Sequence, residues 1–272
     1  MARALQQAPK ARKAVIPAAG KGKRMNVVSA GGHKELLPVG GRPAILYALD
    51  EAVGAGLDEI AIVVSPGKLV IREVLDGLVE VGALAAKLTY VVQNEQRGLG
   101  DAVTLCREFV AGEPFGLLLP DNIFLSSEYD FGGMVALHSE TGLDVVGVVE
   151  LTEEFSQRFG NCGRIAFDTL RPGVLDIRDL EDKKPGRLEI EPGEWVTRTC
   201  GRYLCRPHVF EYLERTRPGY GVPGVELDEV PAYQAIIAEH GALGCVLPGP
   251  LFDTGNPLGY EAANAYLAAD SV

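Results

Sequence analysis

A glycine-rich, basic segment near the start of the chain has the residue types needed to hold a phosphate. Residues 18–25 follow an apolar run and contain Gly20 and Gly22 together with two lysines and Arg24. Small residues let the backbone approach a ligand closely, and glycine permits the φ angles at which several N–H groups converge on an anion. An arginine beside them can bind phosphate oxygens through two hydrogen bonds. Taken alone, the segment is equally consistent with a solvated basic turn.

Two well-known phosphate-binding patterns do not fit this segment. The dinucleotide-binding pattern requires a third glycine at the position of Met25, and the P-loop requires Ser or Thr after Gly-Lys. We therefore consider the segment a candidate phosphate-binding loop of another type, and this hypothesis depends on where the surrounding strands and helices place it.

The first half of the chain alternates between two periodicities. Short apolar runs predict buried strands, and apolar residues at helical spacing predict helices between them. The predicted strands lie at residues 13–20, 59–65, 88–92 and 115–120, and the predicted helices at 43–53, 68–77 and 100–111. This order is typical of an α/β fold whose mainly parallel sheet has helices on both faces. Ligands of such sheets bind beyond the carboxyl ends of the strands, where the glycine loop and Asp121 are expected.

After about residue 142 the pattern changes to short strands joined by turns, which predicts a β-rich lobe. The predicted strands are 144–151, 163–167, 174–178, 188–190 and 199–205, and the predicted helices are 209–215, 227–240 and 260–269. Residues 1–12 are polar and basic and predict a flexible tail, with one domain over residues 13–272.

The bulk composition of the 272 residues narrows the class of protein. A net charge of −11 disfavours a binder of nucleic acid or of membrane surfaces, because phosphate backbones reward basic faces. No apolar run approaches the roughly 20 residues that span a bilayer. The five cysteines are scattered without a CxxC pair, which indicates reduced thiols and a cytoplasmic location rather than a zinc site or a disulfide framework.

Residues after the glycine loop carry a resemblance to a known family. Lys34 stands ten residues after Arg24, in Gly-His-Lys-Glu-Leu-Leu-Pro-Val at positions 32–39, and Gly-Arg-Pro follows. This pattern resembles the sugar-1-phosphate nucleotidyltransferases that make UDP-glucose or dTDP-glucose, which have the same Arg-to-Lys spacing. His33 replaces the family's usual proline, and Lys23 replaces its common threonine or serine.

The resemblance implies a Rossmann-like fold with a nucleotide-binding half at residues 13–142. The sugar-binding half and the C-terminal helix would occupy residues 143–272. Gln-Asn-Glu-Gln-Arg-Gly-Leu-Gly at 93–100 is similar to the family's base-recognition segment, in which the glutamine amide pairs with uracil or thymine. The nucleotide-binding residues so implied are Ala18, Ala19, Gly20, Gly22, Gln93 and Gly98.

The same resemblance implies a magnesium site and a sugar site. Asp121, in Asp-Asn-Ile-Phe, and Asp253, in Asp-Thr-Gly-Asn, would hold Mg²⁺ together, which requires the fold to bring them close. Without the family context each aspartate would be interpreted as a turn residue. The sugar-binding residues implied are Asn122, Gly163, Glu181 and Lys183, and Lys184 is expected on the sugar phosphate, with Lys183 as its rival.

The expected reaction is attack by a sugar-phosphate oxygen on the α-phosphorus of a nucleoside triphosphate, and pyrophosphate is the leaving group. Arg24, Lys34 and Lys184 are the expected catalytic residues, because two polyanions must be aligned and neutralised. Two alternatives stay open: a nucleotidyltransferase for a non-sugar phosphate, similar to cytidylyltransferases, and a weakly catalytic regulatory member of the fold. Relatives are often dimers or tetramers, so a homo-oligomer is also an expectation.

Overall fold

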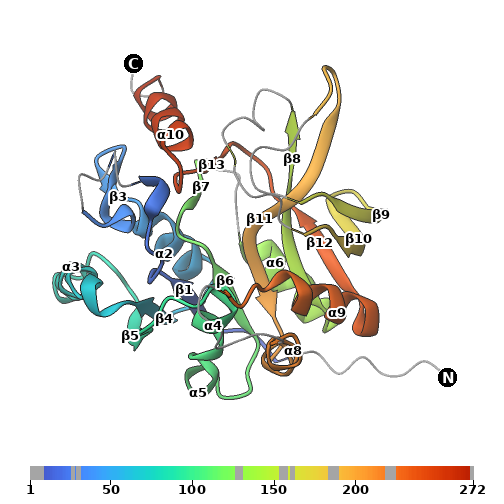
Figure 1. The fold of residues 1–272 in the computed structure, drawn as a ribbon, viewed down its shortest axis with the longest axis horizontal. Coiled ribbons are helices and arrows are strands. Elements are labelled where there is room, and N and C mark those ends of the chain that lie inside the picture. The colour runs from blue at the N-terminus through green and yellow to red at the C-terminus, as the bar shows by residue number, and fades with distance from the viewer. Residues whose placement is uncertain are drawn as a thin grey trace.

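The computed structural model describes residues 9–25, 28, 32–125, 131–152, 159, 163–182, 190–217 and 225–269. Its centre is a nine-stranded sheet with the order β5-β4-β1-β6-β11-β8-β12-β10-β9 (Figure 1). The strands are β1 (Lys13–Pro17), β4 (Glu59–Val64), β5 (Lys87–Val92), β6 (Phe115–Leu118), β8 (Asp144–Thr152), β9 (Ile165–Arg171), β10 (Val174–Leu180), β11 (Trp195–Cys205) and β12 (Ala242–Val246).

Most of this sheet runs in one direction. Strands β5, β4, β1 and β6 are mutually parallel, and β12 is parallel to β8. Strand β11 is antiparallel to both of its neighbours, β6 and β8, and β10 is antiparallel to β12 and β9. The predicted α/β fold with a mainly parallel sheet is therefore confirmed, and the reversed strands lie in the half that was expected to be β-rich.

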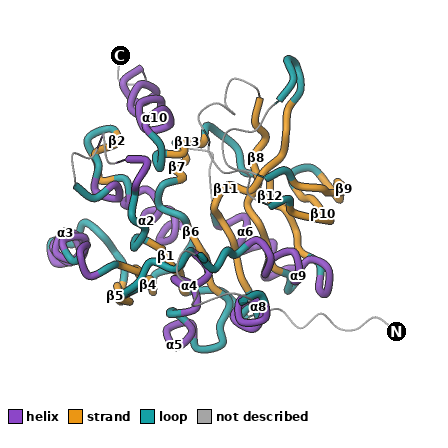
Figure 2. Tube along the Cα trace, in the orientation of Figure 1, coloured by secondary structure: helices purple, strands orange, loops and turns teal. Residues whose placement is uncertain are grey.

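Successive side chains of the central strands point to opposite faces of the sheet, and each face has its own hydrophobic core. In β1, Ala14 and Ile16 pack into one core while Val15 packs into the other, as a side-chain period of two requires. The first core is covered by α2 (Ile45–Gly54), α3 (Val70–Glu80) and α6 (Gly132–Thr141). The second is covered by α4 (Leu99–Thr104), α5 (Arg107–Val110), α8 (Val209–Arg215) and α9 (Val230–His240) (Figure 2).

The chain end forms a third small core beside the first half of the sheet. Strand β13 (Leu251–Asp253) pairs with β7 (Asn122–Phe124), and α10 (Pro257–Ala269) follows directly. Helix α10 lies beside the hairpin of β2 (Pro38–Val39) and β3 (Arg42–Pro43), away from α8 and α9 (Figure 1). The hydroxyl of Tyr260 donates to the carbonyl of Pro38 at 2.8 Å. The C-terminal helix thus supports the side of the molecule that carries the glycine loop.

Several predicted element boundaries are wrong. Pro43 was expected in the first turn of a helix, but it lies in β3, and the helix begins at Ile45. The reason is the pair Gly40 and Gly41, whose φ angles of +56° and +79° form a tight hairpin that draws Pro43 into pairing with Pro38. The helix predicted at 100–111 is divided into α4 and α5.

Further differences lie at the ends and in the second half of the chain. Ala11 is fully buried, and the carbonyl of Arg12 accepts a hydrogen bond from the Glu59 N–H, so packed structure begins before the expected end of the tail. Helix α6 and strand β12 were not predicted. Among the described residues, no helix combines the length and apolar character needed to cross a membrane.

Candidate active site

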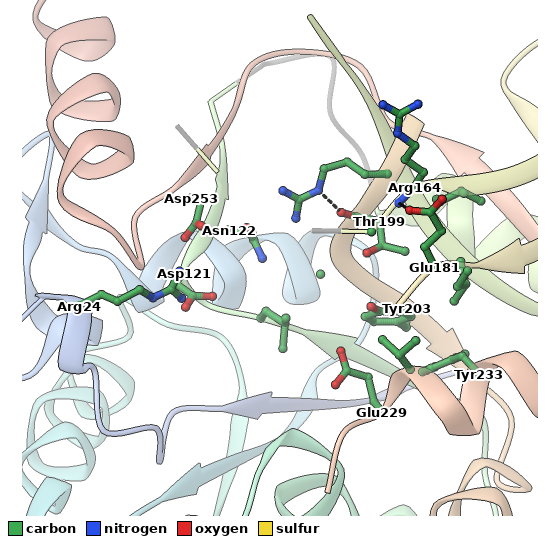
Figure 3. A pocket seen from close by; sticks show the side chains of 17 residues that line it. Arg24, Asp121, Asn122, Arg164, Glu181, Thr199, Tyr203, Glu229, Tyr233 and Asp253 are labelled. Carbon is green, nitrogen blue, oxygen red and sulfur yellow. Dashed lines mark hydrogen bonds between the residues drawn. The ribbon is translucent and has the colours of Figure 1, made fainter. Parts of the chain in front are cut away.

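The carboxyl ends of β1, β4, β5 and β6 meet at one edge of the sheet, where two pockets lie side by side. The glycine-loop pocket is lined by Pro17, Ala19, Gly20, Lys21, Gly22, Lys23, Arg24, Gln93, Gln96, Gly98, Leu99, Ala102, Leu119, Pro120, Asp121 and Glu226. The β11 pocket is lined by Arg24, Leu119, Asp121, Asn122, Gly163, Arg164, Ile165, Leu180, Glu181, Arg198, Thr199, Gly201, Tyr203, Glu229, Val230, Tyr233 and Asp253 (Figure 3). The two pockets share Arg24, Leu119 and Asp121.

The glycine loop is fixed from behind by a buried lysine that the sequence did not indicate. Lys68 Nζ donates to the carbonyl oxygens of Ala18 and Gly20, at 2.9 and 2.6 Å, and to both carboxylate oxygens of Glu35 at 2.8 Å. The N–H of Ala18 donates to the carbonyl of Val63 at the end of β4. The main chain of the loop is therefore attached to two elements of the fold, while the basic residues Lys21, Lys23 and Arg24 are exposed.

Lys34, which is in neither pocket lining, forms an ion pair with Asp121, one of the residues that both pockets share. Lys34 Nζ lies 2.5 Å from Asp121 Oδ2, and both side chains are largely buried. Burial alone would lower the pKa of Lys34, but the charges of Asp121 and Glu35 outweigh it and raise that pKa. Burial would likewise raise the pKa of Asp121, yet the charge and hydrogen bond of Lys34, with Arg24 nearby, hold it below its ordinary value. Both groups are accordingly charged at neutral pH.

The fold brings together the two aspartates that were expected to share a metal ion. Asp253 faces Asn122 in the β13–β7 pair, and the N–H of Thr254 donates to the carbonyl of Asp121 at 2.7 Å. A Cβ added at Gly255 would stand 2.7 Å from Asp121 Oδ2 and 2.9 Å from Asp253 Oδ1. The two carboxylates therefore converge on one point, on the same side of the β11 pocket as Arg24 (Figure 3). Among the described residues, no cluster of three or more His, Cys, Asp and Glu side chains adds a further ligand.

A second buried cation holds the segment that carries Asp121. Arg202 of β11 is fully buried and donates to the carbonyls of Leu119 at 2.9 Å and of Asn122 at 2.6 Å. Its guanidinium also binds both carboxylate oxygens of Glu51 in α2, at 2.5 and 2.8 Å. Sequence reasoning placed Arg202 in a strand but assigned it no role, because its partners lie 80 to 151 positions away.

Gln93 and Gly98 lie together in the glycine-loop pocket. Gln93 Nε2 donates to Asp101 Oδ2 at 2.8 Å and to the carbonyl of Gly98 at 3.3 Å, and the residue is 3% exposed. Gly98 has a φ of +104°, and a Cβ there would lie 2.5 Å from the carbonyl oxygen of Leu227. No side chain fits at this position without displacing backbone.

The expected sugar residues that the structure describes, Asn122, Gly163 and Glu181, line the β11 pocket. A Cβ at Gly163 would lie 2.2 Å from the carbonyl oxygen of Glu181, so only glycine permits these two segments to approach. The N–H of Glu181 donates to the carbonyl of Arg164 at 3.0 Å. Lys183 and Lys184 lie outside the described residues, and their roles stay predictions.

The β11 pocket also contains residues that the sequence did not single out for binding. They are Arg164, Arg198, Glu229 and Tyr233, together with Tyr203, which was interpreted as structural. Figure 3 shows Tyr203, Glu229 and Tyr233 across the pocket from Asp121 and Asp253. Of the residues expected to bind nucleotide, Ala18 contacts Lys68 from behind the loop, and the others line the glycine-loop pocket.

Residues 13–268 match the family model described as nucleotidyl transferase, and the chain belongs to this family. Among its relatives are the UTP–glucose-1-phosphate uridylyltransferases of Staphylococcus epidermidis and Staphylococcus haemolyticus. The first is 30% identical over 274 residues, covering 92% of this chain and 90% of the relative. The second is 29% identical over 269 residues, covering 92% and 89%.

Solved structures give the same grouping. A UDP-glucose pyrophosphorylase in complex with UDP-glucose superposes with a TM-score of 0.79 at 28% identity, covering 95% of this chain and 99% of that one. A glucose-1-phosphate thymidylyltransferase described as putative, from Bacillus anthracis, has a TM-score of 0.74 at 22% identity and covers 94% of each chain. The latter similarity shows the fold alone.

Proposed function

We propose that this protein is a sugar-1-phosphate nucleotidyltransferase that joins UTP and glucose 1-phosphate to give UDP-glucose and pyrophosphate. One observation carries the proposal: a pocket lined by a glycine-rich, basic loop and a second pocket share a wall that contains Arg24 and Asp121. Two substrates held in these pockets would meet with their phosphates at that wall. The named relatives, which act on UTP and glucose 1-phosphate, support the same choice of substrates.

The protein's part in this reaction is alignment and charge neutralisation. A sugar-phosphate oxygen is already an anion at neutral pH, so its attack on the α-phosphorus requires no general base. Arg24 is assigned to the departing β- and γ-phosphates, and Lys34 to the transferred phosphate and the pyrophosphate. Since Lys34 is held by Asp121 before substrate arrives, its charge is positioned in advance rather than gathered from solution.

The donor set at the junction fits a hard divalent cation. Mg²⁺ is commonly bound by one or two carboxylates together with substrate phosphates, and Asp121 and Asp253 offer two converging carboxylates. When bound there, such an ion would neutralise the phosphates of both substrates. Lys34 and the main-chain N–H of Gly255 already contact these carboxylates, so the ligand positions are fixed by neighbouring groups.

Base recognition is assigned to Gln93. Its amide nitrogen faces two acceptors, Asp101 and the Gly98 carbonyl, which fixes the orientation of the amide. None of the described residues donates to the Gln93 carbonyl oxygen, and this oxygen suits the N3–H of uracil or thymine. Asn122, Gly163 and Glu181 are assigned to the sugar.

Pyrophosphate release tests the proposal. The purified protein is incubated with UTP, dTTP, CTP, ATP or GTP, each combined with several sugar 1-phosphates and with non-sugar phosphates, in Mg²⁺ or in EDTA. We expect release with UTP and glucose 1-phosphate, its loss in EDTA, and its loss in Arg24→Ala. Arg171→Ala is the matched control, because Arg171 forms an exposed pair with Glu140 outside both pocket linings.

Each other outcome has a distinct meaning. Release with dTTP alone would keep the reaction and change the base, since the thymine methyl group is read by pocket shape. Release with CTP and a non-sugar phosphate would favour the cytidylyltransferase-like alternative. Folded protein that releases pyrophosphate with no pair would reject the enzymatic assignment.

A further inference from the structure

Lys68 is a buried cation that contacts the glycine loop without lining either pocket. It ends a short helical turn, η3 (Pro66–Lys68), after β4, and the residue is 7% exposed. Its Nζ has four acceptors within 2.9 Å, two of them main-chain carbonyls of the loop and two from Glu35. An ammonium group has three protons, so its hydrogen-bonding capacity is filled within the protein and no proton remains for a ligand.

Glu35 makes this arrangement electrically neutral and links it to the reacting groups. Its side chain is 2% exposed, and it follows Lys34 directly in η2 (Lys34–Leu36). The ion pair of Lys68 and Glu35 therefore fixes the position of the glycine loop relative to the turn that carries Lys34. A buried charge pair of this kind contributes little net stability compared with apolar packing, so its presence at this place calls for a role beyond holding the fold.

The two carbonyl contacts of Lys68 also determine the direction of the N–H groups that follow these carbonyls in the chain. No described peptide bond is cis, so a carbonyl and the following N–H point in opposite directions. With the carbonyls of Ala18 and Gly20 turned inward to Lys68, the N–H groups of Ala19 and Lys21 point away from it. Both of these residues line the glycine-loop pocket, and neither N–H donates to another group within the described part of the chain.

We propose that Lys68, paired with Glu35, is a positioning residue that turns the Ala18–Ala19 and Gly20–Lys21 peptide groups so that their N–H groups face the phosphates of the nucleotide. The identity of the anion as a nucleoside triphosphate rests on the proposed function; the orientation of the loop does not. Lys68 acts through the loop and does not touch the substrate. Its loss must therefore weaken nucleotide binding while leaving the sugar phosphate's own contacts intact.

The pair is best changed together, because Lys68→Met alone leaves the Glu35 carboxylate buried without a partner. The variant Lys68→Met/Glu35→Gln keeps side-chain volume and neutrality. Lys13→Met is the matched control: Lys13 lies at the opposite end of β1, is also buried, and also binds a main-chain carbonyl and a carboxylate, those of Val110 and Glu113. Dissociation constants for UTP and for inorganic pyrophosphate are measured by calorimetry without a second substrate, and KM values for UTP and glucose 1-phosphate by pyrophosphate release.

We expect the double variant to bind UTP and pyrophosphate about tenfold to a hundredfold more weakly, since two hydrogen bonds to charged phosphates are misdirected. Its KM for glucose 1-phosphate should change less than about twofold, and Lys13→Met should match the wild type in all of these values. A folded double variant with unchanged affinity for UTP and pyrophosphate would overturn the inference. If the double variant does not fold, Lys68→Met/Glu35→Leu replaces it, because it also removes the donor to the Ala18 and Gly20 carbonyls, and unchanged affinity there would overturn the inference in the same way.

The direct binding measurement separates this inference from the proposed function. Wild-type protein that binds UTP but releases no pyrophosphate would reject the reaction, and weaker binding in the double variant would still support the role of Lys68. An active wild type combined with unchanged binding in the variant would reject the role of Lys68 alone.

Discussion

Replacing Gly163 by alanine tests the assignment of the sugar pocket at a single atom. The new Cβ would stand 2.2 Å from the carbonyl oxygen and 2.8 Å from the carbonyl carbon of Glu181. Carbon and oxygen atoms pack at roughly 3.2–3.5 Å, so the Glu181 main chain must retreat by about 1 Å. Misplacement of a substrate-positioning group by about 1 Å can cost roughly 100-fold in rate, whereas overpacking costs about 1–3 kcal/mol of stability.

We therefore expect Gly163→Ala to lower kcat/KM for glucose 1-phosphate by about 100-fold, with the KM for UTP unchanged. Thermal unfolding should show a decrease in Tm of about 2–12 °C, on the order of 2–4 °C for each of the 1–3 kcal/mol that overpacking costs. Gly133→Ala in α6 is the control, because a Cβ at Gly133 meets no atom within 4 Å. An unchanged kcat/KM for the sugar phosphate in a folded Gly163→Ala protein would remove Glu181 from the sugar site. Equal losses for both substrates would show that the effect is not local.

Three further predictions follow from contacts elsewhere. Lys34→Met should lower kcat by roughly 10²–10³-fold in initial-rate assays, because its charge is aimed at the phosphates; near-normal turnover would exclude it from the mechanism. Gly255→Ala should raise the Mg²⁺ concentration for half-maximal rate about tenfold, since its Cβ would press on the carboxylates of Asp121 and Asp253; an unchanged Mg²⁺ titration would argue against that site. Asp144→Asn should cost about 2–4 kcal/mol in denaturant titrations at pH 7, because this buried carboxylate pairs with the Arg206 guanidinium and forms a hydrogen bond with the His208 imidazole. Burial would raise the pKa of Asp144, but hydrogen bonds from an imidazole and a main-chain N–H lower it. The contribution of Asp144 to the free energy of unfolding is therefore present above the unfolded pKa near 4 and is lost as pH falls through the lower folded pKa. An Asp144→Asn protein as stable as the wild type at pH 7 would refute this prediction.

Asp121 and Asp253, two of the site residues expected from the sequence, lie together in the structure at the ends of strands. Asp121 comes directly after an apolar run, and the carboxyl ends of parallel strands share one edge, so its proximity to Arg24 could be foreseen. The convergence of Asp253 with Asp121 was stated only as a requirement of a shared ion. The structure meets this requirement because β13 pairs with β7, and no local sequence pattern predicts this contact between distant segments.

What the sequence could not provide are the groups that act from behind the site. Lys68 stands at the start of a helical segment, where a lysine is ordinarily a solvated residue. Its burial depends on the carboxylate of Glu35, 33 positions earlier. Arg202 lies among apolar strand residues, and its role depends on the order of strands in the sheet rather than on any spacing. Lys183 and Lys184 lie in a charge run outside the described residues, so the choice between them is still open.

The buried pair of Arg202 and Glu51 has a consequence for fragments of the chain. Glu51 belongs to the first half of the sequence, and the arginine that neutralises it arrives with β11, 151 positions later. A polypeptide ending near residue 142 would expose the edge of β6 and leave the Glu51 carboxylate and the Leu119 and Asn122 carbonyls without their common partner. The first 142 residues therefore do not contain all the groups that hold the Asp121 segment in place, and β11 has to be inserted into the sheet before Glu51 is neutralised by Arg202.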